Sequence, residues 1–151
     1  MNFYMQAAID EARLGIINGD GGPFGAVVVK DGNIISRGHN SVIKNNDPTC
    51  HGEIEAIRKA CQILDTFDLT GCELYTTGFP CIMCMGAILW SNIEKVYYGC
   101  STQDTELIGF RDKKFEESLD NFRCDLCEEV DRNSCIQLYK EYSNIKNKQN
   151  Y

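Results

Sequence analysis

The first part of the chain changes from a helical to an extended pattern of apolar positions. Between residues 3 and 18, apolar residues recur at spacings of three and four, at Met5, Ala8, Ala12 and Ile16. The glycine- and proline-containing run 18–23 cannot continue that helix. Residues 24–30 are then apolar and β-branched, and Asp31-Gly32 is a strong turn signal before residues 33–37. This pattern predicts a helix followed by a β-hairpin.

The pattern after residue 47 alternates between helices and strands. Pro48 suits the first turn of a helix that Asp47 or Thr49 could cap, and the following apolar residues share one face: Ile54, Ile57, Cys61 and Leu64. Residues 73–77 and 95–99 are typical of short strands, and the apolar stretch 81–90 between them predicts a buried helix ending in Trp90, in the core or a pocket wall. Strand–helix–strand order implies parallel crossovers. We therefore expect a three-layer α/β/α fold with a mixed sheet of about five strands.

The pattern weakens toward the C-terminus. Residues 115–131 are charged, with few apolar anchors, and fit either a helix or irregular structure. Residues 136–145 favour a helix, because Leu138, Tyr142 and Ile145 align on one face. Since 151 residues suffice for one full core and no linker or repeat interrupts them, we expect a single domain over 1–151 with a helical tail from about 136 to 151.

Composition narrows the choice of partners and compartment. The net charge is −7, and the one basic concentration is at residues 140–148, whereas proteins that grip nucleic-acid backbones usually carry a basic patch. This balance favours a small free substrate and makes a nucleic-acid partner unlikely. No apolar run has the length of a membrane span, and the N-terminus lacks the features of a signal peptide, so we expect a cytoplasmic protein. In a reducing compartment, the nine cysteines are expected to be metal ligands and buried thiols.

Four residues have the spacing of a hydrolytic zinc site: His51, Glu53, Cys81 and Cys84. Such a site needs three protein ligands, an open position for water, and a base that is not itself a ligand. Both parts of the motif begin predicted helices, where the positive end of the helix dipole favours a thiolate. The alternative is a core histidine with two buried thiols. Cys124-x-x-Cys127 with Cys135 lacks a nearby fourth ligand, so we interpret these three as ordinary thiols, and His39 as a loop residue near the site.

The motif His51-x-Glu53 followed by Pro80-Cys81-x-x-Cys84 resembles that of zinc-dependent nucleobase deaminases. The chain is similar to the cytidine deaminase superfamily, and within it to the small guanine deaminases, through 21–27, 46–49, 56–61, 84–88 and 109–112 and at the terminal Tyr151. The resemblance implies one Zn²⁺ per subunit, which lowers the pKa of its bound water. It also implies hydrolytic deamination of a free nucleobase, guanine first, in purine metabolism, with Glu53 as the proton carrier.

Further roles come from the resemblance alone. By position, Asn40 matches a substrate-binding asparagine, Asp112 an aspartate that recognises the purine, and Phe24 an aromatic residue beside the base. Tyr151 matches a terminal tyrosine that closes the active site of the other subunit through a swapped C-terminal segment. A homodimer with composite sites is therefore expected.

Two residues depart from the guanine deaminase pattern. Phe79 stands where a glutamate usually precedes Pro-Cys, and Gly52 stands where alanine is commoner. Gly52, with 38–40 and 74–77, is also similar to fungal-type cytosine deaminases. Cytosine or a related aminopyrimidine or aminotriazine is thus the alternative substrate, and a tRNA adenosine deaminase or a non-catalytic zinc module is less favoured. A purely structural zinc site would have no use for Glu53.

Overall fold

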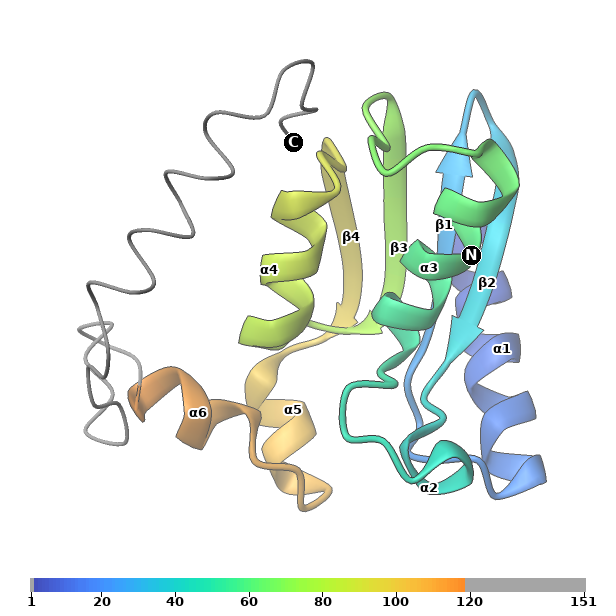
Figure 1. The fold of residues 1–151 in the computed structure, drawn as a ribbon. Coiled ribbons are helices and arrows are strands. Elements are labelled where there is room, and N and C mark those ends of the chain that lie inside the picture. Colours follow the sequence, from blue (N-terminus) through green and yellow to red (C-terminus); the bar gives the residue numbers. More distant parts are fainter. Residues whose placement is uncertain (1, 119–151) are drawn as a thin grey trace, which may run out of the picture. The chain divides into compact units, whose positions relative to one another are not determined.

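A mixed β-sheet is the centre of the fold. The computed structural model describes residues 2–118. Its strands, in the spatial order β2-β1-β3-β4, are β1 (Gly25–Lys30), β2 (Asn33–His39), β3 (Cys72–Gly78) and β4 (Lys95–Cys100). Strand β1 is antiparallel to β2 and to β3, whereas β3 and β4 are parallel (Figure 1). The parallel pair is joined through a helix, which is the usual crossover connection between parallel strands.

The expected count of about five strands was wrong: the described residues contain four. After β4 the chain enters two short helices, α5 (Thr102–Leu107) and α6 (Asp112–Ser118). The first begins at a capping box in which the Ser101 hydroxyl accepts from the Asp104 N–H and the Asp104 carboxylate accepts from the Ser101 N–H. This reciprocal cap stabilises a helix start directly after β4.

Helices cover both faces of the sheet, which confirms the α/β fold expected from the sequence. Helix α1 (Phe3–Asn18) packs Ala7 and Ala8 against one face, which includes Val27, Val29 and Tyr75 of the strands. On the opposite face lie α3 (Gly52–Leu64) and α4 (Ile82–Trp90), and the larger core cluster there includes Ala26, Val28, Ala56, Ile57, Leu74 and Ile88. Successive side chains of β1 thus point alternately into the two core clusters on the two faces of the sheet.

Two details of the helices differ from the expectation. Neither Asp47 nor Thr49 caps α3, because the helix begins at Gly52 with His51 as its N-cap, and Asp47 instead accepts from the Thr49 N–H at 2.8 Å in a local turn. The short helix α2 (Val42–Asn45) precedes this turn. The prediction that 81–90 is a buried helix was also wrong in part: within it only Cys84 and Ile88 are buried, and Trp90 is 70% exposed. Trp90 is therefore not a core residue.

Close contact between β2 and α3 positions the start of that helix. A Cβ atom on Gly38 of β2 would lie 2.4 Å from the Ala56 backbone nitrogen and 2.5 Å from the Gly52 carbonyl oxygen. Only glycine allows two backbones to approach this closely. None of the helices within residues 2–118 combines the length and apolar character that crossing a membrane requires.

Candidate active site

Two helix starts meet at the candidate metal centre. His51 is the N-cap of α3 and Cys81 the N-cap of α4, both in extended backbone conformations. Their carbonyl oxygens accept the first helical hydrogen bonds, from Glu55 and Met85, yet neither side chain caps its own helix. Since N-cap side chains ordinarily bond to the first turn, the imidazole and the thiol are left available for another partner.

The three expected ligand atoms have the spacing of a zinc site. The His51 Nδ1 atom lies 3.5 Å from the Cys81 Sγ atom and 3.6 Å from the Cys84 Sγ atom. Tetrahedral zinc with the usual Zn–N and Zn–S bond lengths would separate nitrogen and sulfur by about 3.6 Å. The ligand atoms all lie within 4.8 Å of one another, so His51, Cys81 and Cys84 could hold Zn²⁺ through one nitrogen and two sulfurs.

Protonation of the two thiols differs sharply. A hydrogen bond from the Cys84 thiol lowers the pKa of Cys81 to about 4, and the bond to His51 acts in the same direction. The bond to Cys81 and burial raise the pKa of Cys84 above its usual range. The pKa of His51 is raised, chiefly by its bond to Cys81. Cys81 is thus a thiolate near neutral pH, the form that binds metals, while Cys84 would release its proton on binding one.

Glu53 lies beside these atoms in the first turn of α3. Its side chain is almost wholly buried, with 5% of the residue exposed. The Oε1 atom accepts from the Thr76 hydroxyl of β3 at 3.2 Å, and Oε2 accepts from the Cys84 thiol at 3.4 Å. Burial is the largest cause that raises the pKa of Glu53. A buried carboxyl group with a raised pKa, next to a candidate metal centre, is suited to taking up and giving back a proton.

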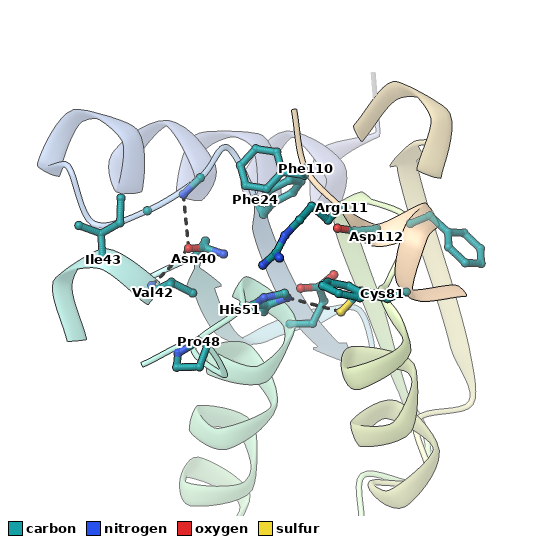
Figure 2. A pocket seen from close by; sticks show the side chains of 15 residues that line it. Phe24, Asn40, Val42, Ile43, Pro48, His51, Cys81, Phe110, Arg111 and Asp112 are labelled. Atoms are coloured by element: carbon teal, nitrogen blue, oxygen red, sulfur yellow. Dashed lines mark hydrogen bonds between the residues drawn. The ribbon is translucent and has the colours of Figure 1, made fainter. Parts of the chain in front are cut away.

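A cavity of about 510 Å³ opens onto this centre, a size typical of small-molecule sites. His51, Glu53 and Cys81 line it together with Phe79. Other residues come from the segment before β1, from the region of α2, from the α5–α6 connection and from the start of α6. They are Gly21, Gly22, Phe24, Asn40, Val42, Ile43, Pro48, Phe110, Arg111, Asp112 and Phe115 (Figure 2). The cavity therefore brings together segments that are distant in the sequence.

Asn40 presents a defined edge to the cavity. Its Oδ1 atom accepts from the backbone N–H of Gly22 at 3.3 Å and of Val42 at 3.2 Å, and the residue is only 5% exposed (Figure 2). The two N–H groups of the amide remain to donate to a ligand. The guanidinium of Arg111 also extends into the cavity in this view and adds further donors.

The remaining walls are aromatic and acidic. The rings of Phe24 and Phe110 meet edge to face with centroids 4.8 Å apart, and Phe79 makes a similar contact with Tyr98 at 5.0 Å. Asp112 begins α6, and burial is the largest cause that raises the pKa of its carboxyl group. The cavity thus combines flat apolar walls with hydrogen-bond donors on Asn40 and an acceptor on Asp112.

The structure brings together seven of the eight expected site residues: His51, Glu53, Cys81, Cys84, Asn40, Asp112 and Phe24. Tyr151 lies outside the described residues, as do Cys124, Cys127 and Cys135. His39 is the last residue of β2, so its interpretation as a loop residue was wrong. Thr76, Phe110 and Arg111 were not identified from the sequence as site residues. Thr76 gave no distinctive signal, because the same strand also contains Glu73 and a second threonine, Thr77.

Together, the α/β fold, the three metal-binding side chains and the adjoining buried carboxyl group define a zinc-dependent hydrolytic enzyme of the deaminase type. Residues 1–100 match the family model described as the cytidine and deoxycytidylate deaminase zinc-binding region. The chain belongs to this family.

Individual relatives carry two different names. The chain is 45% identical to a guanine deaminase of Bacillus subtilis over 117 residues, or 78% of this chain and 75% of that protein. It is 48% identical to a tRNA-specific adenosine deaminase of Aquifex aeolicus over 96 residues, 64% of this chain and 63% of that protein. The crystal structure of guanine deaminase from Bacillus subtilis superimposes with a TM-score of 0.93 at 39% identity, covering 100% of this chain and 99% of that one. All three similarities support a deaminase, on different substrates.

Proposed function

We propose that the protein deaminates free guanine, consuming water and producing xanthine and ammonia. The observation that carries this proposal is the fixed amide of Asn40. Because its oxygen is already bonded to two backbone N–H groups, it offers only donors to a ligand. Guanine has a ring carbonyl that can accept hydrogen bonds from the Asn40 N–H groups. It also has ring N–H groups that can donate to an acceptor such as Asp112. The aromatic walls at Phe24 and Phe110 suit a flat bicyclic base.

We assign the role of zinc ligands to His51, Cys81 and Cys84. Zinc held there would lower the pKa of water and polarise the reacting centre. Glu53 accepts the proton that water loses as its oxygen adds to the amino-bearing ring carbon, and delivers it to a neighbouring ring nitrogen. Glu53 then takes the proton of the added hydroxyl and gives it to the amino group, so that the C–N bond breaks, the ring carbonyl of xanthine forms and ammonia leaves. The Thr76 hydroxyl keeps the Glu53 carboxyl group directed at this position.

Two observations favour guanine over the substrates of other family members. The guanine deaminase structure superimposes on 100% of this chain with a TM-score of 0.93, whereas a structure from a study of tRNA:A34 deaminases superimposes on 65% of it with a TM-score of 0.63. The net charge of −7 is unfavourable for a polynucleotide substrate. Phe79 in the cavity wall is the feature that would suit a smaller or less polar base, so cytosine remains the comparison substrate.

A substrate panel tests this proposal. Ammonia release is measured with zinc-loaded protein and guanine, cytosine, adenine, isocytosine or an aminotriazine, and inosine formation is measured in an adenosine-containing tRNA anticodon stem. We expect the highest kcat/KM with guanine. Absence of ammonia from every free base, or turnover of the tRNA alone, would overturn the proposal. Glu53→Gln should retain zinc and lose turnover, and Lys59→Gln on the exposed side of the same helix serves as the control.

We also propose a cytoplasmic homodimer in which residues 136–151 close the cavity of the partner. Mixed subunits distinguish a swapped tail from one that folds back. One subunit carries Glu53→Gln with its tail, and the other keeps Glu53 but lacks residues 136–151. A swapped tail restores activity in the mixed dimer, because the intact tail reaches the intact glutamate. Activity that stays at the level of the separate variants would contradict the swap.

A further inference from the structure

A buried charged cluster lies behind the cavity wall that contains Asn40. The His39 ring, at the end of β2, is placed between two carboxylates from different segments. Its Nδ1 atom lies 2.8 Å from Glu11 Oε1 of α1, and its Nε2 atom lies 2.8 Å from Asp20 Oδ2. The three side chains are only 12%, 12% and 6% exposed. Neither the metal centre nor Glu53 takes part in these contacts.

The geometry defines the charge on the ring. An ionised carboxylate can only accept hydrogen bonds, so both bonds form together only when both ring nitrogens carry a proton. The bond from His39 is the largest cause that lowers the pKa of Asp20, and the Lys44 ammonium lies 3.3 Å from the same carboxylate oxygen. His39 and Lys44 together balance Glu11 and Asp20. When His39 is an imidazolium, these four described side chains therefore carry no net charge as a group.

The fit around the ring leaves no room for it to move toward α1. A Cβ atom on Gly15 would lie 2.7 Å from the His39 Cδ2 atom. The Gly15 carbonyl also accepts from the Asp20 N–H at 2.9 Å, which ties the end of α1 to the loop that carries Asp20. Glycine at position 15 therefore allows the helix to pack directly on the imidazole.

The same cluster fixes the cavity wall. The Asp20 carbonyl accepts from the backbone N–H groups of Ile43 and Lys44, each at 3.0 Å, and so holds α2 in place. Asn40 follows His39 directly, and its Oδ1 atom bonds to Gly22 in the loop after Asp20 and to Val42 at the start of α2. The charged cluster thus joins the three segments that orient the Asn40 amide, which are the end of β2, the loop after Asp20 and α2, and it also ties them to Glu11 of α1.

We propose that His39, as an imidazolium between Glu11 and Asp20, is a positioning residue that orients Asn40 toward the substrate. This proposal rests on the proposed function of the same cavity. Because the cluster acts on the Asn40 wall and does not touch Glu53 or the ligand atoms, its loss should weaken substrate binding and leave the chemical step unchanged.

The kinetic test uses His39→Gln, which keeps a polar side chain but cannot carry a positive charge. We expect KM for guanine to rise roughly tenfold, because a charge-assisted bond is lost, while kcat stays within about twofold and zinc content is unchanged. Arg13→Ala is the matched control. Arg13 pairs with Asp10 on the exposed side of α1, the helix that also carries Glu11, so this change should leave both KM and kcat unchanged. A KM within twofold of wild type in His39→Gln would overturn the proposal.

Two measurements do not depend on the substrate. In ¹⁵N-labelled wild-type protein at pH 7, both ring nitrogens of His39 should give the signals of protonated nitrogens, and a neutral ring would refute the proposal. Amide hydrogen exchange at Gly22 and Val42 should be roughly tenfold faster in His39→Gln, and unchanged exchange would also refute it. If that variant does not fold, Asp20→Asn is measured in its place with the same criteria. Lack of turnover in wild type counts against the proposed function, while these two results still decide the role of His39.

Discussion

Thr76→Val isolates the hydrogen bond that holds Glu53. Thr76 is 1% exposed, and valine has nearly the same shape, so the main change is the loss of the hydroxyl that donates to Glu53 Oε1 at 3.2 Å. Leaving a buried acceptor without its donor costs about 1–3 kcal/mol. The bond is longer than the roughly 2.5–2.7 Å that is common for a hydroxyl on a carboxylate, which favours the lower end. A loss of about 1 kcal/mol in transition-state stabilisation corresponds to roughly a fivefold lower kcat.

The assay is steady-state ammonia release, with zinc content and melting temperature measured on the same samples. We expect kcat to fall while KM and zinc content stay near wild type, because Thr76 contacts the proton carrier and not the ligand atoms. Ser36→Ala is the matched control: its buried hydroxyl donates to the Ala56 carbonyl of the same helix at 2.7 Å, away from the cavity. An unchanged kcat in Thr76→Val, or an equal fall in Ser36→Ala, would refute this account of Glu53.

Three further outcomes follow from the packing and the metal centre. Gly38→Ala should lower the free energy of unfolding by about 1–3 kcal/mol in urea titrations, whereas Gly86→Ala on α4, where a Cβ meets nothing within 4 Å, should not lower it. Removing zinc with a chelator should abolish turnover and lower the melting temperature reversibly; a ligand at a hundredfold excess over its Kd contributes about 2.7 kcal/mol. Burial raises the pKa of Tyr75 to about 12, so the folded state holds the phenol proton longer than the unfolded chain. Stability should therefore fall as pH rises from about 10 toward 12, and Tyr75→Phe should remove that slope.

Local periodicity was sufficient to predict the elements that carry the site. The stripe in 3–18 became α1 with the same bounds, and the apolar segment before Asp31-Gly32 became β1, paired with β2. The signal for α1 is strong because one side of that helix is buried against the sheet, and the signal for β1 is strong because both faces of that strand are buried, which gives a continuous apolar run. Trp90 was misplaced because a uniformly apolar helix gives no indication of which side faces the core.

Residues that depend on tertiary contacts were harder to predict. Phe110 and Arg111 lie at the cavity because the capping box at Ser101 starts α5 directly after β4, and the sequence pattern predicted no element for residues 101–114. Thr76 matters through its contact with Glu53, 23 residues earlier in the chain. The His39 cluster likewise joins residues from 11 to 44, which no local pattern brings together.

The caps of α3 and α4 explain why the site and the fold depend on each other. Asp47 and Thr49 looked like helix caps, yet the chain uses them in a turn and begins α3 at His51. Replacing a capping side chain by a non-capping one typically costs about 1 kcal/mol, so two uncapped helix starts are a local destabilisation. In return, the imidazole and the Cys81 thiolate are directed at one point beside Glu53. A metal bound there would join the two helix starts, so its binding free energy would also stabilise the fold. The positions where the chain departs from ordinary helix capping are thus those where its chemistry is concentrated.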